Sequence, residues 1–226
     1  FPTRRSSDLS TNKNLVSAIY RLKFDEHFFL QLLMALKKQY TKEKIGVVFD
    51  KKGPYVKSIY DSLSFTLTNA QINVLREIRA DLGLNRPMNR LIQGDVGSGK
   101  TIVAMLAASI IIGNGYQVAV MAPTEILTEQ HYNSFKSYCD KVNISCNLLI
   151  GNQSKKIKSD IHSQLSNGEI QLIVGTHSLI QDDVKFSKLG MIVIDEQHRF
   201  GVEHRKKLID KGEHPEILAM TATPIP

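Results

Sequence analysis

From residue 88 onward, short apolar runs alternate with longer segments whose apolar residues recur at helical spacing. Runs rich in Val and Ile are typical of strands buried on both faces, and their alternation with helices indicates parallel βαβ units. The pattern predicts an α/β fold with a mostly parallel, doubly wound sheet flanked by helices. The expected strands span 88–93, 116–122, 144–150, 170–174, 190–194 and 216–220, and the expected helices span 100–112, 125–139, 153–166 and 202–210.

The N-terminal part follows a different pattern. Residues 10–44 are charged and helical, and residues 24–36 are apolar on most faces, so this helix must pack against another surface. Residues 45–62 contain a Gly-Pro turn and are predicted to be irregular. We therefore expect a helical connector over residues 10–62.

A capping box marks the start of the main domain. Thr68 and Gln71 have the T-x-x-Q spacing that opens a helix, and the apolar residues after them have helical spacing. The main domain is thus expected to span residues 63–226. The first nine residues read as one frame of a common sequencing-adapter oligonucleotide, so we interpret 1–9 as a non-native leader and exclude it from the fold.

The composition is that of an ordinary soluble globular protein. The chain has 226 residues, of which 42% are hydrophobic and 23% charged, and no apolar run approaches the length of a membrane span. The net charge of +7 weakly favours polyanionic partners such as nucleic acid. Cys139 and Cys146 lack metal-ligand spacing and are expected to be free buried thiols in a reducing cytoplasm.

The strongest chemical signal is a phosphate-binding loop. Residues 94–101 fit the pattern G-x-x-x-x-G-K-[ST] between a predicted strand and a predicted helix. Glycines let the backbone approach a phosphate, and the freed N–H groups point at the anion. Lys100 is expected to reach the β- and γ-phosphates of ATP, and Thr101 to ligate Mg²⁺. The predicted nucleotide-binding residues of this loop are Gly94, Asp95, Val96, Gly97, Ser98, Gly99, Lys100 and Thr101.

Two carboxylates follow the apolar run 191–194. Asp195 at the strand end is expected to hold Mg²⁺, and Glu196 to orient and deprotonate the attacking water. One carboxylate cannot serve both purposes well, because a metal-bound carboxylate is a poor base. By itself such a pair is more often an acidic strand end facing solvent, and only the phosphate-binding loop in the same chain favours the catalytic interpretation.

Four further polar residues lie near the predicted site. Gln197 and His198 are expected to sense the γ-phosphate by hydrogen bonding, although His198 also fits an ordinary loop histidine. Thr221 and Thr223 end another strand and are expected to couple the Asp195 strand end to a bound polymer, or else simply to form a strand exit before Pro224.

Gln71 has two interpretations. It can contact the adenine edge of a nucleotide with Phe65 packing on the base, or it can serve only as the capping-box partner of Thr68; both can hold together.

Three loops follow other predicted strands, where ligands of open α/β sheets bind. They offer backbone N–H groups, hydroxyls and lysines that suit a sugar-phosphate backbone without sequence readout. Lys155, Lys156 and Lys158 also fit a solvated helix face. The predicted nucleic-acid contacts are Pro123, Thr124, Gly151, Lys155, Lys156, Thr176 and His177.

These segments together resemble the first motor domain of superfamily 2 helicases. The segments 94–101, 195–202 and 221–226 are most similar to the RecG family, ATP-dependent helicases that remodel branched DNA, and the transcription-repair coupling translocases share much of the pattern. The resemblance implies a RecA-like P-loop NTPase domain, ATP and Mg²⁺ as cofactors, and DNA forks or Holliday junctions as substrates of a cytoplasmic, monomeric enzyme.

The same resemblance implies a wedge domain before this region and a second motor domain after it, and neither is recognisable in the chain. We therefore expect the chain alone to turn over ATP weakly or not at all. Two other classes stay open: a truncated module that binds nucleotide or DNA without turnover, and a small-molecule phosphotransferase, for which no substrate pocket or lid is visible.

Overall fold

The computed structural model describes residues 12–42, 45–50 and 53–222, which fall into two compact units, 1–44 and 45–226. The first unit contains the helix α1 (Asn12–Lys42). Its apolar side chains are largely exposed within the unit, for example Tyr20 at 75% and Phe29 at 64%. The expectation that this helix packs against another surface stays a prediction.

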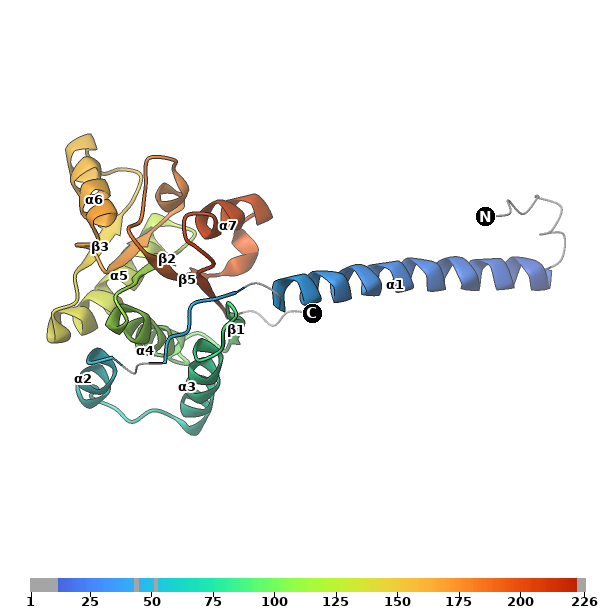
Figure 1. Cartoon of the computed structure of the whole chain (residues 1–226), viewed down its shortest axis with the longest axis horizontal. Coiled ribbons are helices and arrows are strands. Elements are labelled where there is room, and N and C mark those ends of the chain that lie inside the picture. The colour runs from blue at the N-terminus through green and yellow to red at the C-terminus, as the bar shows by residue number, and fades with distance from the viewer. Residues whose placement is uncertain (1–11, 43–44, 51–52, 223–226) are drawn as a thin grey trace. The chain divides into compact units, whose positions relative to one another are not determined.

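The second unit is built on one parallel sheet of six strands, as the alternating pattern predicts. Figure 1 shows the sheet at the centre of this unit with helices on both sides. The strands, in sheet order, are β1 (Asn89–Gln93), β6 (Glu216–Thr221), β5 (Leu189–Asp195), β2 (Gln117–Met121), β4 (Leu172–Gly175) and β3 (Cys146–Leu149).

The central strands are apolar throughout because helices cover both faces. Every residue of β2, β4 and β5 is buried, whereas the edge strand β1 exposes alternate residues. Alternate side chains enter two separate cores: Val118 and Val120 pack with α4, and Ala119 and Met121 pack on the other face.

The helices divide between these two faces. One face is covered by α2 (Tyr55–Asp61), α3 (Asn69–Leu82), α4 (Lys100–Gly113) and α5 (Glu125–Cys139). The other is covered by α6 (Lys155–Asn167) and α7 (Val202–Ile209), as Figure 1 also shows. Short 3₁₀ turns lie at Asp140–Val142, His177–Ile180 (η3) and Gln197–Arg199 (η4).

The capping box predicted from sequence is present at the start of α3. The Thr68 hydroxyl accepts a hydrogen bond from the Gln71 backbone N–H, and the Gln71 side chain accepts one from the Thr68 N–H. These bonds satisfy two of the donors that a helix start leaves open.

Residues 45–62 differ from the sequence-based expectation. They are not irregular throughout, because α2 forms over seven residues, too few for a helical period to stand out. They also belong to the compact unit 45–226 rather than with α1, since Phe49 and Ile59 are buried in its core at 1% and 0% exposure.

Cys139 and Cys146 are both free and buried. The adjacent Cys139 thiol and burial raise the pKa of the Cys146 thiol, which disfavours the reactive thiolate. Within the described ranges, no helix combines the length and the apolar character that crossing a bilayer requires.

Candidate nucleotide and nucleic-acid site

Apart from Phe65 and Gln71, which precede β1, the predicted site residues lie at or after the carboxyl ends of the six strands, along the edge of the sheet that these strand ends form. The loops after β1 and β5 carry the predicted phosphate-binding, metal-binding and catalytic residues, and β6, which lies between these strands, ends at the predicted coupling residue Thr221. The loops after β2, β4 and β3, which are neighbours in the sheet, carry the predicted polymer contacts. The strand order thus places the two predicted sets of contacts in adjacent halves of this edge, which meet where β5 pairs with β2.

The phosphate loop has the backbone that its glycines were expected to allow. Gly97 and Gly99 both have φ of +80°, in the left-handed region that side chains disfavour. Gly99 is the residue that precedes α4, so the loop leads directly into the helix N-terminus. At the other end, Gly94 N–H donates to the Thr221 carbonyl at 3.2 Å, which joins the loop to β6.

Lys100 folds back over the loop. Its ammonium nitrogen donates to the carbonyl oxygens of Gly94 at 2.7 Å and Asp95 at 2.9 Å. An ammonium group has three donors, so Lys100 can hold these two carbonyls and still bind one phosphate oxygen.

The two carboxylates occupy different environments. Asp195 ends β5 and is 8% exposed. Glu196 has a left-handed backbone with φ of 49°, and its carboxylate lies 3.5 Å from the Thr221 hydroxyl and 3.4 Å from the Ala222 N–H. The left-handed turn therefore directs two consecutive acids into separate contacts, and the division of their roles stays a prediction.

His131 is a site residue that the sequence analysis did not single out. Its Nε2 lies 2.7 Å from Asp195 Oδ2, and the two side chains are 15% and 12% exposed. The residues are 64 positions apart. No sequence pattern pairs His131 with Asp195; the sequence places His131 only about two turns into the helix predicted after the strand 116–122.

The cavity bounded by these residues suits a magnesium–nucleotide. It has a volume of about 390 Å³ and is lined by Gly97, Lys100, Thr101, His131, Asp195 and Glu196 among others. A Cβ at Gly97 would meet no atom within 4 Å, so the backbone there is open to a ligand. Thr101 and Asp195 supply the oxygen donors that Mg²⁺ prefers, and Lys100 supplies the countercharge for phosphate. The side chains that line this cavity therefore fit a bound magnesium–nucleotide.

Gln71 connects α3 to the phosphate loop. While its side-chain oxygen caps α3, its Nε2 donates to the Ser98 carbonyl at 2.9 Å. Phe65 is 48% exposed, and it is not among the residues that line the cavity. The adenine contact of Gln71 and Phe65 stays a prediction.

The remaining predicted residues on this side are placed unequally. His198 is 52% exposed, with Nδ1 3.4 Å from Glu196 Oε2, and neither it nor Gln197 lines the cavity. Thr221 is buried at 4% and contacts both the phosphate loop and Glu196. Thr223 lies outside the described residues.

The predicted polymer contacts come together on the other half of the edge. Thr124 caps α5, accepting from Leu127 N–H at 3.3 Å, and follows Pro123. The Gly151 N–H donates to Glu125 Oε1 at 3.0 Å, which ties the loop after β3 to the start of α5. Lys155 and Lys156 are exposed in the first turn of α6, whereas Lys158 donates to the Gly151 carbonyl at 2.6 Å.

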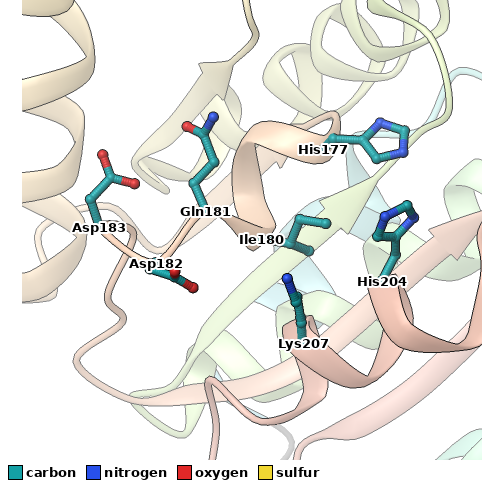
Figure 2. Close-up of a pocket in the computed structure, with 7 residues that line it drawn as sticks. All are labelled: His177, Ile180, Gln181, Asp182, Asp183, His204 and Lys207. Carbon is teal, nitrogen blue, oxygen red and sulfur yellow. The ribbon is translucent and has the colours of Figure 1, made fainter.

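Thr176 and His177 follow β4 between these loops. Thr176 is buried, with its hydroxyl 3.4 Å from that of Ser178, while His177 is exposed. Figure 2 shows the His177 ring beside His204 of α7, and their ring centres are 5.1 Å apart. The two rings border a hollow of about 540 Å³ whose other side carries Asp182 and Asp183.

This hollow does not have the character of a metal centre. In the described part of the chain, no three His, Cys, Asp or Glu side chains are grouped closely enough to hold a metal ion. The loop on its far side is held by Lys211, whose ammonium donates to the Gln181 and Val184 carbonyls at 2.6 and 2.7 Å. These two bonds hold the loop in place, and burial lowers the pKa of Lys211, while Asp182 and Asp183 oppose this effect.

Comparison with known protein families decides which class of nucleotide site this is. The model of the DEAD/DEAH box helicase family matches residues 68–226, well over half of the chain. The chain belongs to the DEAD/DEAH box helicase family. Membership of this helicase family implies the use of ATP, consistent with the cavity described above.

The resemblance to RecG seen in the sequence is confirmed by curated helicases of that name. The chain is 48% identical to ATP-dependent DNA helicase RecG of Synechocystis sp. over 91% of the chain, 47% identical to that of Bacillus subtilis over 96%, and 42% identical to that of Escherichia coli O157:H7 over 100%. These matches cover 25%, 32% and 33% of the relatives, so the chain spans about a quarter to a third of their length.

Solved helicase structures agree with this assignment. A structure of RecG bound to a three-way DNA junction is similar over 96% of the chain and 29% of that protein, with a TM-score of 0.81 and 44% identity. The helicase domain of Hef from Pyrococcus furiosus is similar over 70% of the chain and 33% of that protein, with a TM-score of 0.54 and 23% identity, which supports the fold alone. The predicted fold, a RecA-like domain with a parallel sheet flanked by helices, is confirmed.

Proposed function

We propose that the chain is the ATP-binding motor domain of a DNA helicase that couples ATP hydrolysis to the remodelling of branched DNA. The observation that carries this proposal is the division of one sheet edge into two halves. The loops after β1 and β5 carry the proposed nucleotide residues, the loops after β2, β4 and β3 carry the proposed polymer contacts, and the two halves adjoin at β5 and β2. A small-molecule phosphotransferase has no use for the second half.

On the nucleotide half, each residue has a separate task. Lys100 binds the β- and γ-phosphates, the loop glycines present backbone N–H groups to them, and Thr101 with Asp195 holds Mg²⁺. Bound Mg-ATP supplies the phosphoryl group whose transfer to water drives the motor. Glu196 orients that water and accepts its proton, and its contact with the Ala222 N–H holds it beside Thr221.

Several finer assignments belong to the same proposal. Gln197 and His198 sense the γ-phosphate, and Gln71 with Phe65 contacts the adenine. Thr221 and Thr223 couple the nucleotide half to bound DNA. Thr221 contacts both Gly94 and Glu196, which supports its coupling role. A shift of β6 would move the phosphate loop and the general base Glu196 together.

The DNA contacts are assigned to the sugar-phosphate backbone. Five of the proposed contacts lie at the ends of the neighbouring strands β2, β4 and β3: Pro123, Thr124, Thr176, His177 and Gly151. The exposed side chains of Lys155 and Lys156 add positive charge. The net charge of +7 agrees with a polyanionic partner. The RecG relatives and the junction-bound RecG structure support branched DNA as the substrate, in preference to the substrate of a transcription-repair coupling translocase.

We further propose that this domain acts as a monomer in the cytoplasm, together with a second motor domain and a wedge domain of the same polypeptide. The coverage of its relatives supports this larger arrangement. A second motor domain would supply the arginine that stabilises the transferring phosphoryl group, an effect worth about 10³- to 10⁵-fold in rate.

The proposal is tested by nucleotide affinity and DNA-stimulated ATP hydrolysis of the protein and its Lys100→Ala variant. Removing a charged donor to phosphate costs about 1.5–3 kcal/mol, so nucleotide affinity should fall about 10- to 100-fold. If Lys100→Ala bound nucleotide as tightly as the wild type, the cavity at residues 94–101 would not be the nucleotide site. Nucleotide and DNA binding without any turnover, even beside a second motor domain, would favour the non-catalytic module.

A further inference from the structure

The contact between His131 and Asp195 links two elements that serve different halves of the site. Nε2 of His131 and Oδ2 of Asp195 are 2.7 Å apart, and both side chains are mostly buried. An ionised carboxylate only accepts hydrogen bonds, so Nε2 carries the proton and donates it. Asp195 also lines the cavity that Thr101 lines, so this bond is made at the edge of the predicted Mg²⁺ site.

His131 lies on α5, whose first turn belongs to the polymer half. Thr124 caps this helix, and Glu125 in its first turn accepts the Gly151 N–H at 3.0 Å. His131 follows Thr124 by seven residues, which is two turns and about 10 Å along the helix. The first turn of α5 therefore contacts two loops that are predicted to bind DNA, those at Thr124 and Gly151. The middle of the same helix carries His131, the partner of Asp195.

Buried side chains hold α5 in place before and after His131. The Thr128 hydroxyl donates to the Thr124 carbonyl at 2.7 Å, and Thr128 is fully buried. Phe135, one turn beyond His131, is also fully buried, and its ring lies 6.4 Å from the His131 ring. Because buried side chains before and after His131 hold α5 against the core, we expect a displacement of its first turn to reach His131.

We propose that His131 is a positioning residue that orients the Asp195 carboxylate for Mg²⁺, and that α5 couples this orientation to DNA held at the Thr124 and Gly151 loops. This inference rests on the proposed function, since it presumes that Asp195 binds Mg²⁺ and that these loops bind DNA. It assigns to α5 the link between the two halves of the sheet edge, a role separate from that of Thr221 on β6.

The first test is the affinity for a fluorescent ADP analogue with Mg²⁺ and with EDTA in its place. His131→Ala should weaken the affinity about tenfold in Mg²⁺, because the Asp195 carboxylate is left without its hydrogen-bond donor, and leave it unchanged in EDTA. His131→Gln should retain most of the affinity, since the Gln amide nitrogen can occupy the position of Nε2. His131→Asn is too short to reach Asp195 and should behave like His131→Ala.

His162→Ala is the matched control. His162 has the same 15% exposure and also lies near a carboxylate, with Nδ1 3.4 Å from Asp183, but it does not line the nucleotide cavity. Its removal should leave the affinity unchanged in both conditions. Thermal unfolding of each variant checks the fold, and the comparison of the Gln and Asn variants keeps the test valid if His131→Ala is unstable.

The coupling is tested by the same titration with and without a forked DNA. In the wild type, DNA should change the affinity for Mg²⁺–nucleotide, and nucleotide should change the affinity for DNA by the same factor. His131→Asn should reduce that factor toward one, whereas His131→Gln should keep it.

The two levels of the proposal fail differently. Absence of nucleotide or DNA binding by the wild type would overturn the proposed function. Normal binding, with an unchanged Mg²⁺ dependence in His131→Ala and His131→Asn, would overturn the positioning role of His131. An altered Mg²⁺ dependence with unchanged DNA coupling would overturn the role of α5.

Discussion

The side-chain amide of Gln71 donates a hydrogen bond to the Ser98 carbonyl at 2.9 Å while its oxygen caps α3. One side chain thus joins the helix before β1 to the phosphate loop after it. The two interpretations of Gln71, a capping partner or a nucleotide contact, are therefore not exclusive, because capping fixes the amide against the loop.

We predict that Gln71→Ala and Thr68→Ala have different consequences. Thr68→Ala should cost about 1 kcal/mol of stability through loss of the cap and leave nucleotide affinity nearly unchanged. Gln71→Ala should cost a similar amount and also lower nucleotide affinity severalfold, since the loop loses its tie to α3. Urea unfolding and nucleotide titration measure both effects. If the two variants had equal nucleotide affinity, the role of Gln71 would be limited to capping α3.

The glycines of the phosphate loop offer a second comparison. Gly97→Ala and Gly99→Ala should each cost about 1–2 kcal/mol, because both positions have φ of +80°. At Gly99 the added Cβ would also overlap the side-chain amide nitrogen of Gln71, whereas at Gly97 it meets nothing within 4 Å. Only Gly99→Ala should therefore release Gln71 from Ser98.

A double-mutant cycle between positions 71 and 99 tests this effect. Thermal unfolding should give non-additive losses for Gly99→Ala with Gln71→Ala and additive losses for Gly97→Ala with Gln71→Ala. Additivity in both cycles would mean that Gln71 moves aside without losing its bond.

The lysines of α6 should divide into two groups. Lys155 and Lys156 are exposed, so replacing either by Ala should weaken DNA binding. The slope of log affinity against log salt should also become shallower by about 0.7–0.9 for each DNA phosphate that the variant no longer neutralises. Lys57, exposed on α2 over the opposite face of the sheet, is the control, and its replacement by Ala should change neither quantity.

Lys158 should behave differently from its two neighbours. It donates to the Gly151 carbonyl at 2.6 Å, so Lys158→Ala should loosen the Gly151 loop and cost about 1 kcal/mol of stability. The slope of log DNA affinity against log salt should therefore change less in Lys158→Ala than in Lys155→Ala. Equal changes in the two variants would mean that Lys158 neutralises a DNA phosphate.

Glu216 predicts a pH dependence of stability. It is 1% exposed at the start of β6, where its Oε2 accepts a hydrogen bond from the Met88 N–H. Burial raises the pKa of Glu216 from 4.5 to about 8, and nearby Asp81 adds to this effect while the Met88 bond opposes it. The folded protein thus holds a proton that the unfolded chain releases between these two values.

Stability should therefore fall as pH rises through this window, by at most about 1.4 kcal/mol per pH unit. Glu216→Gln stays neutral and should remove that part of the slope, whereas the exposed Glu213→Gln should not. Urea unfolding between about pH 5.5 and pH 7.5 measures the difference. If the free energy of unfolding of Glu216→Gln depends on pH as that of the wild type does, Glu216 has the same pKa in the folded and unfolded protein.

The sequence by itself determined the features that depend on neighbouring residues. The strands, most helices, the capping box of Thr68 and the loop at 94–101 were all predictable, because periodicity, capping and glycine conformations are local properties. The short helix α2 was missed, since seven residues carry too little periodicity and its position depends on the burial of Ile59.

Only the tertiary structure decided which of these features meet. The contact of His131 with Asp195 joins residues 64 positions apart, and the bond from Gln71 to Ser98 joins residues 27 apart. The first depends on the strand order, which pairs β5 with β2, and the second on the packing of α3 and α4 in one core. The physical reason is that burial drives strands into a sheet without specifying their neighbours locally, whereas distances of about 3 Å exist only once that order is set.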